Sequence, residues 1–135
     1  MGQATKMTPM KIEHVALWTR DLERSRAFYE TYFGGQSNAK YTNSVKQFES
    51  YFMTFDDGAR LELMQMPTIP DGTDHQTIGW VHIAMSVGSK AEVDEITERL
   101  RDAGYIVDGE PRTTGDGYYE SVILDPDGNR IEITV

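Results

Sequence analysis

Four residues of two metal-binding types recur at matched positions in the two halves of the chain. His14 and Glu62 lie in the first half, and His82 and Glu132 in the second. Each histidine opens a His-aliphatic-Ala triplet, and each glutamate lies in a Gly-x-Arg-aliphatic-Glu-aliphatic segment. Imidazole nitrogens and carboxylate oxygens suit divalent ions such as zinc and nickel. We therefore predict that these four residues are the ligands of one divalent metal ion per site.

A shared cleft for the four side chains requires a cation. Two carboxylates and two imidazoles held together without one would cost several kcal/mol through desolvation and like-charge repulsion, whereas a divalent ion makes the cluster favourable. Taken singly, a strand histidine or glutamate is more often a solvated or structural residue than a metal ligand. Their recurrence at matched positions favours the metal site.

The matched segments also indicate that the chain is a duplicated module. The chain has 135 residues, of which 39% are hydrophobic, and this size suits one compact domain. We expect a flexible tail over residues 1–10 and a single domain over residues 11–135. Within it we place module one at residues 11–66, a linker at 67–78 and module two at 79–135.

Composition limits the classes of function. The absence of cysteine excludes disulfides, thiolate metal sites and cysteine nucleophiles. A formal net charge of −9 opposes binding to the phosphate backbone of nucleic acids. No apolar segment has the length of a signal peptide core or a membrane span. We expect a cytoplasmic protein that acts on a small molecule and binds neither nucleic acid nor a membrane.

Module one reads as βαβββ. Residues 11–19 form an apolar, β-branched run typical of a strand. Asp21 is a helix cap for residues 22–33, which Gly34 and Gly35 end. Residues 36–43 and 47–55 are predicted strands, and Asp56-Asp57-Gly58 is a hairpin turn leading into a strand over 59–66.

Module two repeats that order. Residues 79–87 are a predicted strand, and Ser89 to Glu92 form a capping box for a helix that Gly104 ends. Residues 105–112, 118–125 and 129–135 are predicted strands, with the turn Pro126-Asp127-Gly128 before the last. The linker carries two prolines and several turn formers, including His75, which we expect to be solvated.

Strand alternation places the four candidate ligands on the less aliphatic face of each strand. His14 is opposite Val15, and Glu62 is opposite Leu61 and Leu63. Module two follows the same pattern. Since helices with apolar stripes must cover the aliphatic face, we predict that the ligands face a cleft on the other side. Within each module, the histidine and glutamate strands must then be neighbours.

The chain resembles the vicinal oxygen chelate superfamily, which includes glyoxalase I, methylmalonyl-CoA epimerase, fosfomycin resistance proteins, bleomycin-binding proteins and extradiol dioxygenases. The motifs that carry the resemblance are His14-Val15-Ala16, Asp21-Leu22 with Phe28-Tyr29, His82-Ile83-Ala84 and the run from Asp125 to Glu132. The resemblance implies an α+β fold of two βαβββ modules, whose curved mixed sheets surround a metal-binding cleft. It also implies a homodimer, in which the metal site is often completed across the subunit interface. Both arrangements are compatible with the sequence: all four ligands from one chain, or His14 and Glu62 from one chain and His82 and Glu132 from another.

The ligand set is similar to the His-Glu-His-Glu set of glyoxalase I, in which zinc or nickel holds a hemithioacetal and a ligand glutamate moves a proton. The resemblance thus implies a lyase or isomerase similar to lactoylglutathione lyase. Removing a proton from carbon beside a carbonyl builds negative charge on oxygen, which a metal stabilises. We assign proton transfer to Glu132 by its position, with Glu62 as ligand or second base.

Two other functions are compatible with the same cleft. One is a protein that binds a drug or metabolite without turnover. The other is an Fe(II) dioxygenase of extradiol type, although such enzymes use two histidines and one carboxylate, and Glu62 adds a second carboxylate. Arg60 and Arg130, each two residues before a glutamate, are candidates to orient the carboxylates.

Overall fold

The computed structural model describes residues 9–72 and 77–135. Residues 1–8 of the predicted tail, and 73–76 of the predicted linker with His75, lie outside the described residues. Module one comprises one helix and five strands: β1 (His14–Trp18), α1 (Leu22–Phe33), β2 (Gln36–Ser37), β3 (Tyr41–Asn43), β4 (Phe48–Thr54) and β5 (Arg60–Gln65). Module two comprises β6 (Ile83–Ser86), α2 (Lys90–Asp102), β7 (Val107–Thr113), β8 (Tyr119–Leu124) and β9 (Arg130–Thr134).

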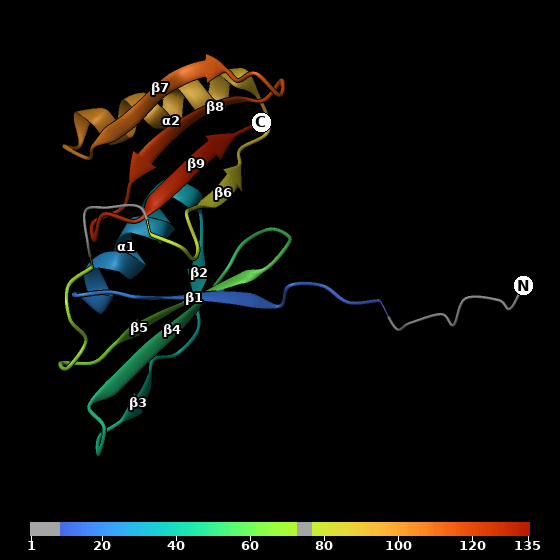
Figure 1. The fold of residues 1–135 in the computed structure, drawn as a ribbon. Coiled ribbons are helices and arrows are strands. Elements are labelled where there is room, and N and C mark those ends of the chain that lie inside the picture. Colours follow the sequence, from blue (N-terminus) through green and yellow to red (C-terminus); the bar gives the residue numbers. More distant parts are fainter. Residues whose placement is uncertain (1–8, 73–76) are drawn as a thin grey trace, which may run out of the picture.

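Each module folds its strands into one mixed sheet, and the two sheets lie in different parts of the molecule (Figure 1). Sheet A has the order β1-β5-β4-β2, with β3 also paired to β4. Sheet B has the order β6-β9-β8-β7. In each sheet the first and last strands of the module are parallel neighbours, and the other pairs are antiparallel. The predicted mixed α+β fold and the predicted neighbouring strands are confirmed.

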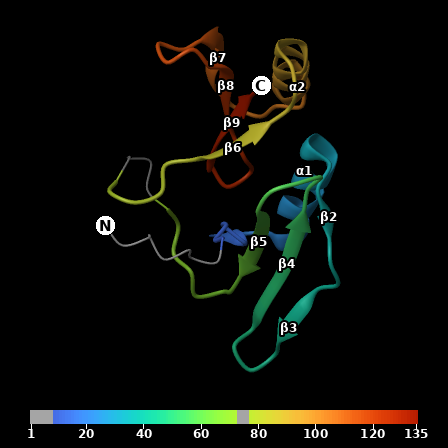
Figure 2. The ribbon, with the colours of Figure 1, turned by 90° about the vertical axis from the view of Figure 1, so that its right-hand side faces the viewer.

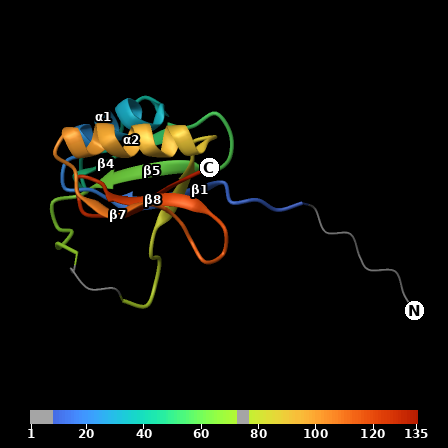
Figure 3. The same cartoon turned by 90° about the horizontal axis from the view of Figure 1, so that it is seen from above.

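Both helices lie on the same side of the strands (Figure 3), and the chain between the modules runs on the other side (Figure 2). The predicted caps are confirmed. The Asp21 side chain accepts a hydrogen bond from the amide of Arg24, and Ser89 accepts one from the amide of Glu92. Such caps satisfy amide groups that the first helical turn leaves without partners. Gly34 ends α1 with φ of 68°, a left-handed conformation that favours glycine.

Two predicted strands differ most from the structure, and the strand predicted over residues 11–19 is also shorter, covering only His14–Trp18. The strand predicted over residues 36–43 is divided into β2 and β3, because a break after Ser37 lets each piece pair with a different part of β4. The strand predicted from residue 79 begins only at Ile83. The residues before it include Trp80, which is 99% exposed. Pairing with β9 starts at Ile83 opposite Ile131, so the residues before His82 have no strand beside them.

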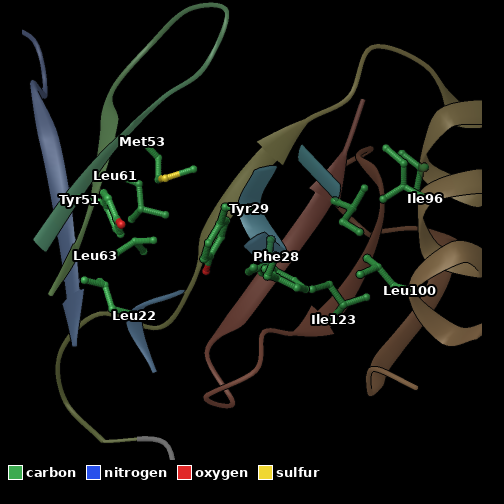
Figure 4. Packing of buried hydrophobic residues seen from close by; sticks show 13 residues of the cluster. Leu22, Phe28, Tyr29, Tyr51, Met53, Leu61, Leu63, Ile96, Leu100 and Ile123 are labelled. Atoms are coloured by element: carbon green, nitrogen blue, oxygen red, sulfur yellow. The ribbon is translucent and has the colours of Figure 1, made fainter. Parts of the chain in front are cut away.

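The hydrophobic core is continuous across the two modules. Buried leucine, isoleucine and methionine side chains of β4, β5, β8 and β9 point toward the helices. Phe28 and Tyr29 of α1 lie between the groups contributed by the two sheets (Figure 4). Phe28 also packs edge-on against Tyr105, at a centroid distance of 5.0 Å. The first helix therefore joins the modules as well as covering its own sheet.

The buried carboxylate of Asp125 also stabilises the contact between the two modules. Asp125, which is 4% exposed, accepts a hydrogen bond of 2.7 Å from the hydroxyl of the fully buried Tyr29. It also accepts hydrogen bonds from the amides of Asp127 and Asn129 and from the Asn129 side chain. The turn before β9 is thus held to α1 of the other module. Burial and Asp125 raise the pKa of Tyr29 well above its usual value, so the hydroxyl remains a donor.

Asp127, in the same turn, adds a second set of contacts with module one. Its carboxylate accepts hydrogen bonds from the hydroxyls of Thr19 and Ser25 and from the guanidinium of Arg24. The amide of Arg20 donates a further bond of 3.0 Å to it. In the segment from Asp125 to Glu132, the two aspartates therefore join the modules, and the last residue, Glu132, is the candidate metal ligand.

We expect Tyr29→Phe to lower the free energy of unfolding by about 2 kcal/mol. The substitution removes the hydroxyl that donates to the buried Asp125, and hydrogen bonds to charged groups contribute about 1.5–3 kcal/mol. Urea unfolding followed by circular dichroism measures the loss. Tyr118→Phe is the matched control, because Tyr118 is 58% exposed and should change stability by less than about 0.5 kcal/mol. Equal stability of the two variants would contradict the role of Tyr29.

None of the helices in the described residues has both the length and the apolar composition needed to cross a membrane.

Candidate metal centre

Each sheet carries one histidine and glutamate pair with the same local geometry. In sheet A, the Nε2 atom of His14 lies 3.8 Å from an Oε1 atom of Glu62. In sheet B, the Nε2 atom of His82 lies 3.1 Å from Oε1 of Glu132. Glu62 is opposite Ala16 and Glu132 is opposite Ala84, each two residues beyond the histidine, so the registers are identical. We call these pairs half-site A and half-site B.

The half-sites lie on the faces that strand alternation predicted. The flanking leucines of Glu62 and isoleucines of Glu132 are buried beneath the helices. The side chains of His14 and His82 keep 41% and 33% of their surface exposed, and those of Glu62 and Glu132 keep 17% and 22%. Carboxylates that are largely covered by protein and an imidazole open to solvent leave room for a further group at each half-site.

Half-site A has a carboxylate that orients its histidine. Glu13 Oε1 lies 3.2 Å from Nδ1 of His14, and Nε2 faces Glu62. A proton on Nδ1 leaves the lone pair on Nε2, which is the arrangement found when a carboxylate supports a metal-bound histidine. Hydrogen bonds from Arg60 and from His14 lower the pKa of Glu13 and keep it ionised. These contacts fit His14 as a ligand through Nε2.

The described parts of the chain contain no cluster of three or more His, Asp or Glu residues able to surround one metal. The structure brings His14 to Glu62 and His82 to Glu132, but it does not bring the two pairs together within one chain. One chain therefore offers two incomplete ligand sets. A four-ligand centre requires the missing half of each set to come from a second chain.

The two arginines make contacts other than those considered from the sequence. Arg60 bonds to Glu13 and lies over the ring of Phe52, with 4.1 Å between the guanidinium carbon and the ring centroid. Arg130 forms an ion pair with Asp108 at 2.5 Å. These contacts therefore do not orient Glu62 or Glu132. Arg60 instead positions Glu13, and through it the His14 ring.

Glu120 is a residue of half-site B that the sequence did not single out. It lies on β8, the strand paired with that of Glu132, and is 9% exposed. Burial, together with the neighbouring Glu132 carboxyl, raises the pKa of Glu120 above its usual value. The corresponding position of sheet A is Ser50, which is opposite Met64 as Glu120 is opposite Thr134. The register of the duplicated strands would have revealed this asymmetry.

The pKa of Asp125, in the turn before β9, predicts how the stability of the protein depends on pH. Burial raises this pKa above its ordinary value, against the opposing effect of hydrogen bonds from Asn129 and Tyr29. The Asp125 carboxyl therefore binds its proton more tightly in the native state than in the unfolded chain. The contribution of this protonation to the free energy of unfolding decreases as pH rises through the raised pKa. In Asp125→Asn this titration is absent.

We expect the difference in free energy of unfolding between the natural chain and Asp125→Asn to decrease from about pH 4 to about pH 7. Urea unfolding of both proteins across this range measures the slope. An increase with pH would contradict the raised pKa of Asp125.

Comparison with known proteins places the whole domain in one group. The profile of the Glyoxalase/Bleomycin resistance protein/Dioxygenase superfamily matches residues 11–133. Among curated relatives, the uncharacterized protein YwbC of Bacillus subtilis (strain 168) is 30% identical over 127 residues, which cover 90% of this chain and 94% of YwbC.

Two solved structures show the extent of the structural likeness. A glyoxylase/bleomycin resistance protein/dioxygenase domain from Frankia sp. EAN1pec superposes with a TM-score of 0.81 at 20% identity, covering 95% of this chain and 98% of that domain. A lactoylglutathione lyase from Agrobacterium tumefaciens superposes with a TM-score of 0.67 at 26% identity, covering 95% of each chain.

Proposed function

The chain belongs to the Glyoxalase/Bleomycin resistance protein/Dioxygenase superfamily, and from that premise we propose that it is a metal-dependent lyase or isomerase of the glyoxalase I type. The observation that carries the proposal is the pair of half-sites with identical register, each offering one imidazole nitrogen and one carboxylate oxygen. The likeness to a structure named lactoylglutathione lyase supports it.

We propose that two copies of the chain complete the centre. Half-site A and half-site B are alike in ligand type, and neither is complete alone. In a dimer with twofold symmetry, a contact between half-site A of one subunit and half-site B of its partner occurs twice. Such a dimer has two equivalent sites, each with His14 and Glu62 from one subunit and His82 and Glu132 from the other.

The donor set fits zinc or nickel, because both accept nitrogen and carboxylate oxygen ligands and the chain contains no cysteine. When bound, the ion supplies stabilisation of negative charge on substrate oxygen. Glu13 orients His14 for this role. Glu132 takes the proton from the carbon beside the substrate carbonyl and returns it to the neighbouring carbon.

The surroundings of the two glutamates favour Glu132 over Glu62 as the base. Glu132 has the Glu120 carboxyl beside it, whereas Glu62 lies opposite the ring of Phe52. Because the pKa of Glu120 is raised, half-site B has a second carboxyl that holds a proton more readily than usual. Half-site B is therefore suited to proton transfer, and half-site A to holding the ion.

Two measurements on the purified, metal-loaded protein test the proposal. Metal analysis with native mass spectrometry should find a dimer with two zinc or nickel ions. Turnover of the hemithioacetal formed from methylglyoxal and a thiol should be measured as the rise in ultraviolet absorbance when the thioester product forms, with glutathione and other thiols compared. A dimer that binds two ions yet shows no turnover with any thiol would contradict the substrate class while leaving the metal centre standing.

A binding protein that uses the same cleft is the second candidate. The observation that favours it is a hollow of about 380 Å³ lined by aromatic side chains on sheet A. Ligand binding that is unaffected by His14→Ala and His82→Ala, in a protein without turnover, would support this candidate. A ligand that requires both histidines would count against it.

A further inference from the structure

Sheet A carries a second feature on the same face as half-site A. Trp18, Tyr41 and Phe48 line a hollow of about 380 Å³, together with Met66, Asn43 and Lys46. The Phe48 ring is the centre of this group. Its centroid lies 6.1 Å from that of Trp18 and 6.0 Å from that of Tyr41, both in edge contact.

The aromatic rings of this hollow are exposed more than core packing requires. Trp18 is 40% exposed and Tyr41 is 55% exposed. Adjacent exposed aromatic surfaces are unfavourable in water, and in soluble proteins they commonly mark a binding site. The volume of the hollow also falls within the range of small-molecule pockets, about 300–1,000 Å³.

The rim of the hollow is cationic. Lys46 lies in the turn between β3 and β4, where its amide donates a 3.2 Å hydrogen bond to the side-chain oxygen of Asn43. Within the described residues no carboxylate forms an ion pair with Lys46, whereas Lys40 on the same sheet is paired with both Glu23 and Glu49. A lysine that is not paired with a carboxylate and lies beside the rings of Trp18, Tyr41 and Phe48 is complementary to an aromatic anion.

Module two has an aromatic residue at only one of the three positions that match Trp18, Tyr41 and Phe48. Trp18 is opposite Met64 in sheet A, and the matching position of sheet B is Ser86, opposite Thr134. By the same register the position of Phe48 corresponds to Tyr118. The duplicated sheets thus share the metal-binding residues but differ in this surface. A ligand that contacts both sheets would therefore meet different surfaces on the two.

We infer that the hollow lined by Trp18, Phe48 and Lys46 binds an aromatic ring with an anionic substituent, as the distal part of the substrate. Trp18 follows His14 by four residues on β1, and the two side chains share a face. At about 3.3 Å per residue they are about 13 Å apart along the strand. The ligand therefore combines an aromatic anion at one end with oxygen donors about 13 Å away. That this ligand is the substrate rests on the proposed function, whereas its binding in the hollow does not.

Two probes with the same aromatic skeleton test the hollow. They are 8-anilinonaphthalene-1-sulfonate, which is anionic, and N-phenyl-1-naphthylamine, which lacks the sulfonate. Titrations use the full chain with Trp80→Phe, so that Trp18 is the single tryptophan and its quenching reports binding nearby. A chelator is present throughout, which separates this test from metal binding and turnover.

We expect Lys46→Met to weaken binding of the sulfonate about fivefold at low salt and to leave the neutral probe within about twofold. Phe48→Ala should weaken both probes about tenfold, because it removes the central ring. The controls are Lys90→Met and Tyr118→Ala, the latter at the matching position of module two, and neither should change binding.

Four results would overturn the inference, the last being that neither probe binds at all. The first is equal affinity for both probes, and the second is unchanged binding in Phe48→Ala. In the third, Phe48→Ala converts a dimer to monomers in sedimentation, which would assign the aromatic surface to subunit contact. If the probes fail to bind while the protein still binds two metal ions and turns over hemithioacetals, the hollow is wrong and the proposed function stands.

Discussion

Glu132→Gln is expected to lower the turnover of hemithioacetal substrates by about 10³-fold while the protein still binds its metal. The amide keeps the shape and one oxygen donor of the carboxylate, but it cannot accept a proton. Removing a positioned general base commonly costs between about 10² and 10⁴ in rate. Steady-state kinetics of the metal-loaded variant, with metal content measured on the same sample, gives the result.

Glu62→Gln is the matched comparison for this prediction, because Glu62 has the same place in half-site A. We expect it to retain at least about tenfold more activity than Glu132→Gln, since the position of sheet A that matches Glu120 is Ser50, which cannot hold an exchangeable carboxyl proton. Glu98→Gln, on the exposed face of α2, should be unchanged. The reverse order of the two half-site variants would assign proton transfer to Glu62.

His14→Ala and His82→Ala are each expected to weaken zinc binding by about 100-fold or more. Each substitution removes one nitrogen donor from a set of four, and the partner glutamate cannot replace it. Glu13→Gln should weaken binding about tenfold, because it removes the carboxylate that orients His14, and such supporting contacts commonly contribute 10- to 100-fold. Competition with a chromophoric chelator measures the affinities.

His75→Ala is the control for these variants, since His75 is the remaining histidine of the chain. Unchanged zinc affinity in this variant, with loss in the other two, would exclude general surface binding by imidazoles. If His14→Ala and His82→Ala bind zinc as the natural chain does, the four-ligand centre is wrong.

The duplication made much of the fold predictable. Alternation of residues around Glu62 and Glu132 correctly predicted which faces the helices cover, and the matched positions correctly predicted that β1 lies beside β5 and β6 beside β9. Local signals of this kind need no knowledge of distant contacts. Caps at Asp21 and Ser89 were predictable for the same reason, because the cap and the amide it serves are three residues apart.

Contacts between modules could not be predicted. The bond from Tyr29 to Asp125 joins residues 96 positions apart, and each residue type is ordinary in its own segment. The pairing of Arg60 with Glu13, rather than with Glu62, likewise depends on how β1 and β5 align. Strand alternation predicted that the four candidate ligands face a cleft, but it could not decide whether one chain or two supplies them, because that depends on how the two sheets pack. In the described residues they form two separate pairs.

We propose that each metal centre combines half-site A of one subunit with half-site B of its partner, and hybrid dimers test this arrangement. In the first hybrid dimer, one subunit carries His14→Ala and the other carries His82→Ala. The two chains, marked with different affinity tags, can be unfolded together, refolded and purified as this hybrid. In a dimer with shared sites, both substitutions fall in one site and the other site is complete. The hybrid should therefore recover about half of the zinc capacity and activity of the natural dimer.

A second hybrid gives the opposite expectation. When a chain with both substitutions pairs with a natural chain, each shared site lacks one histidine, and zinc binding and activity should be almost lost. If each chain instead formed its own centre, this second hybrid would keep half of the capacity and the first would keep almost none. Zinc bound per purified hybrid is the deciding measurement: about one ion in the first hybrid and none in the second is expected, and the reverse would contradict a centre shared between subunits.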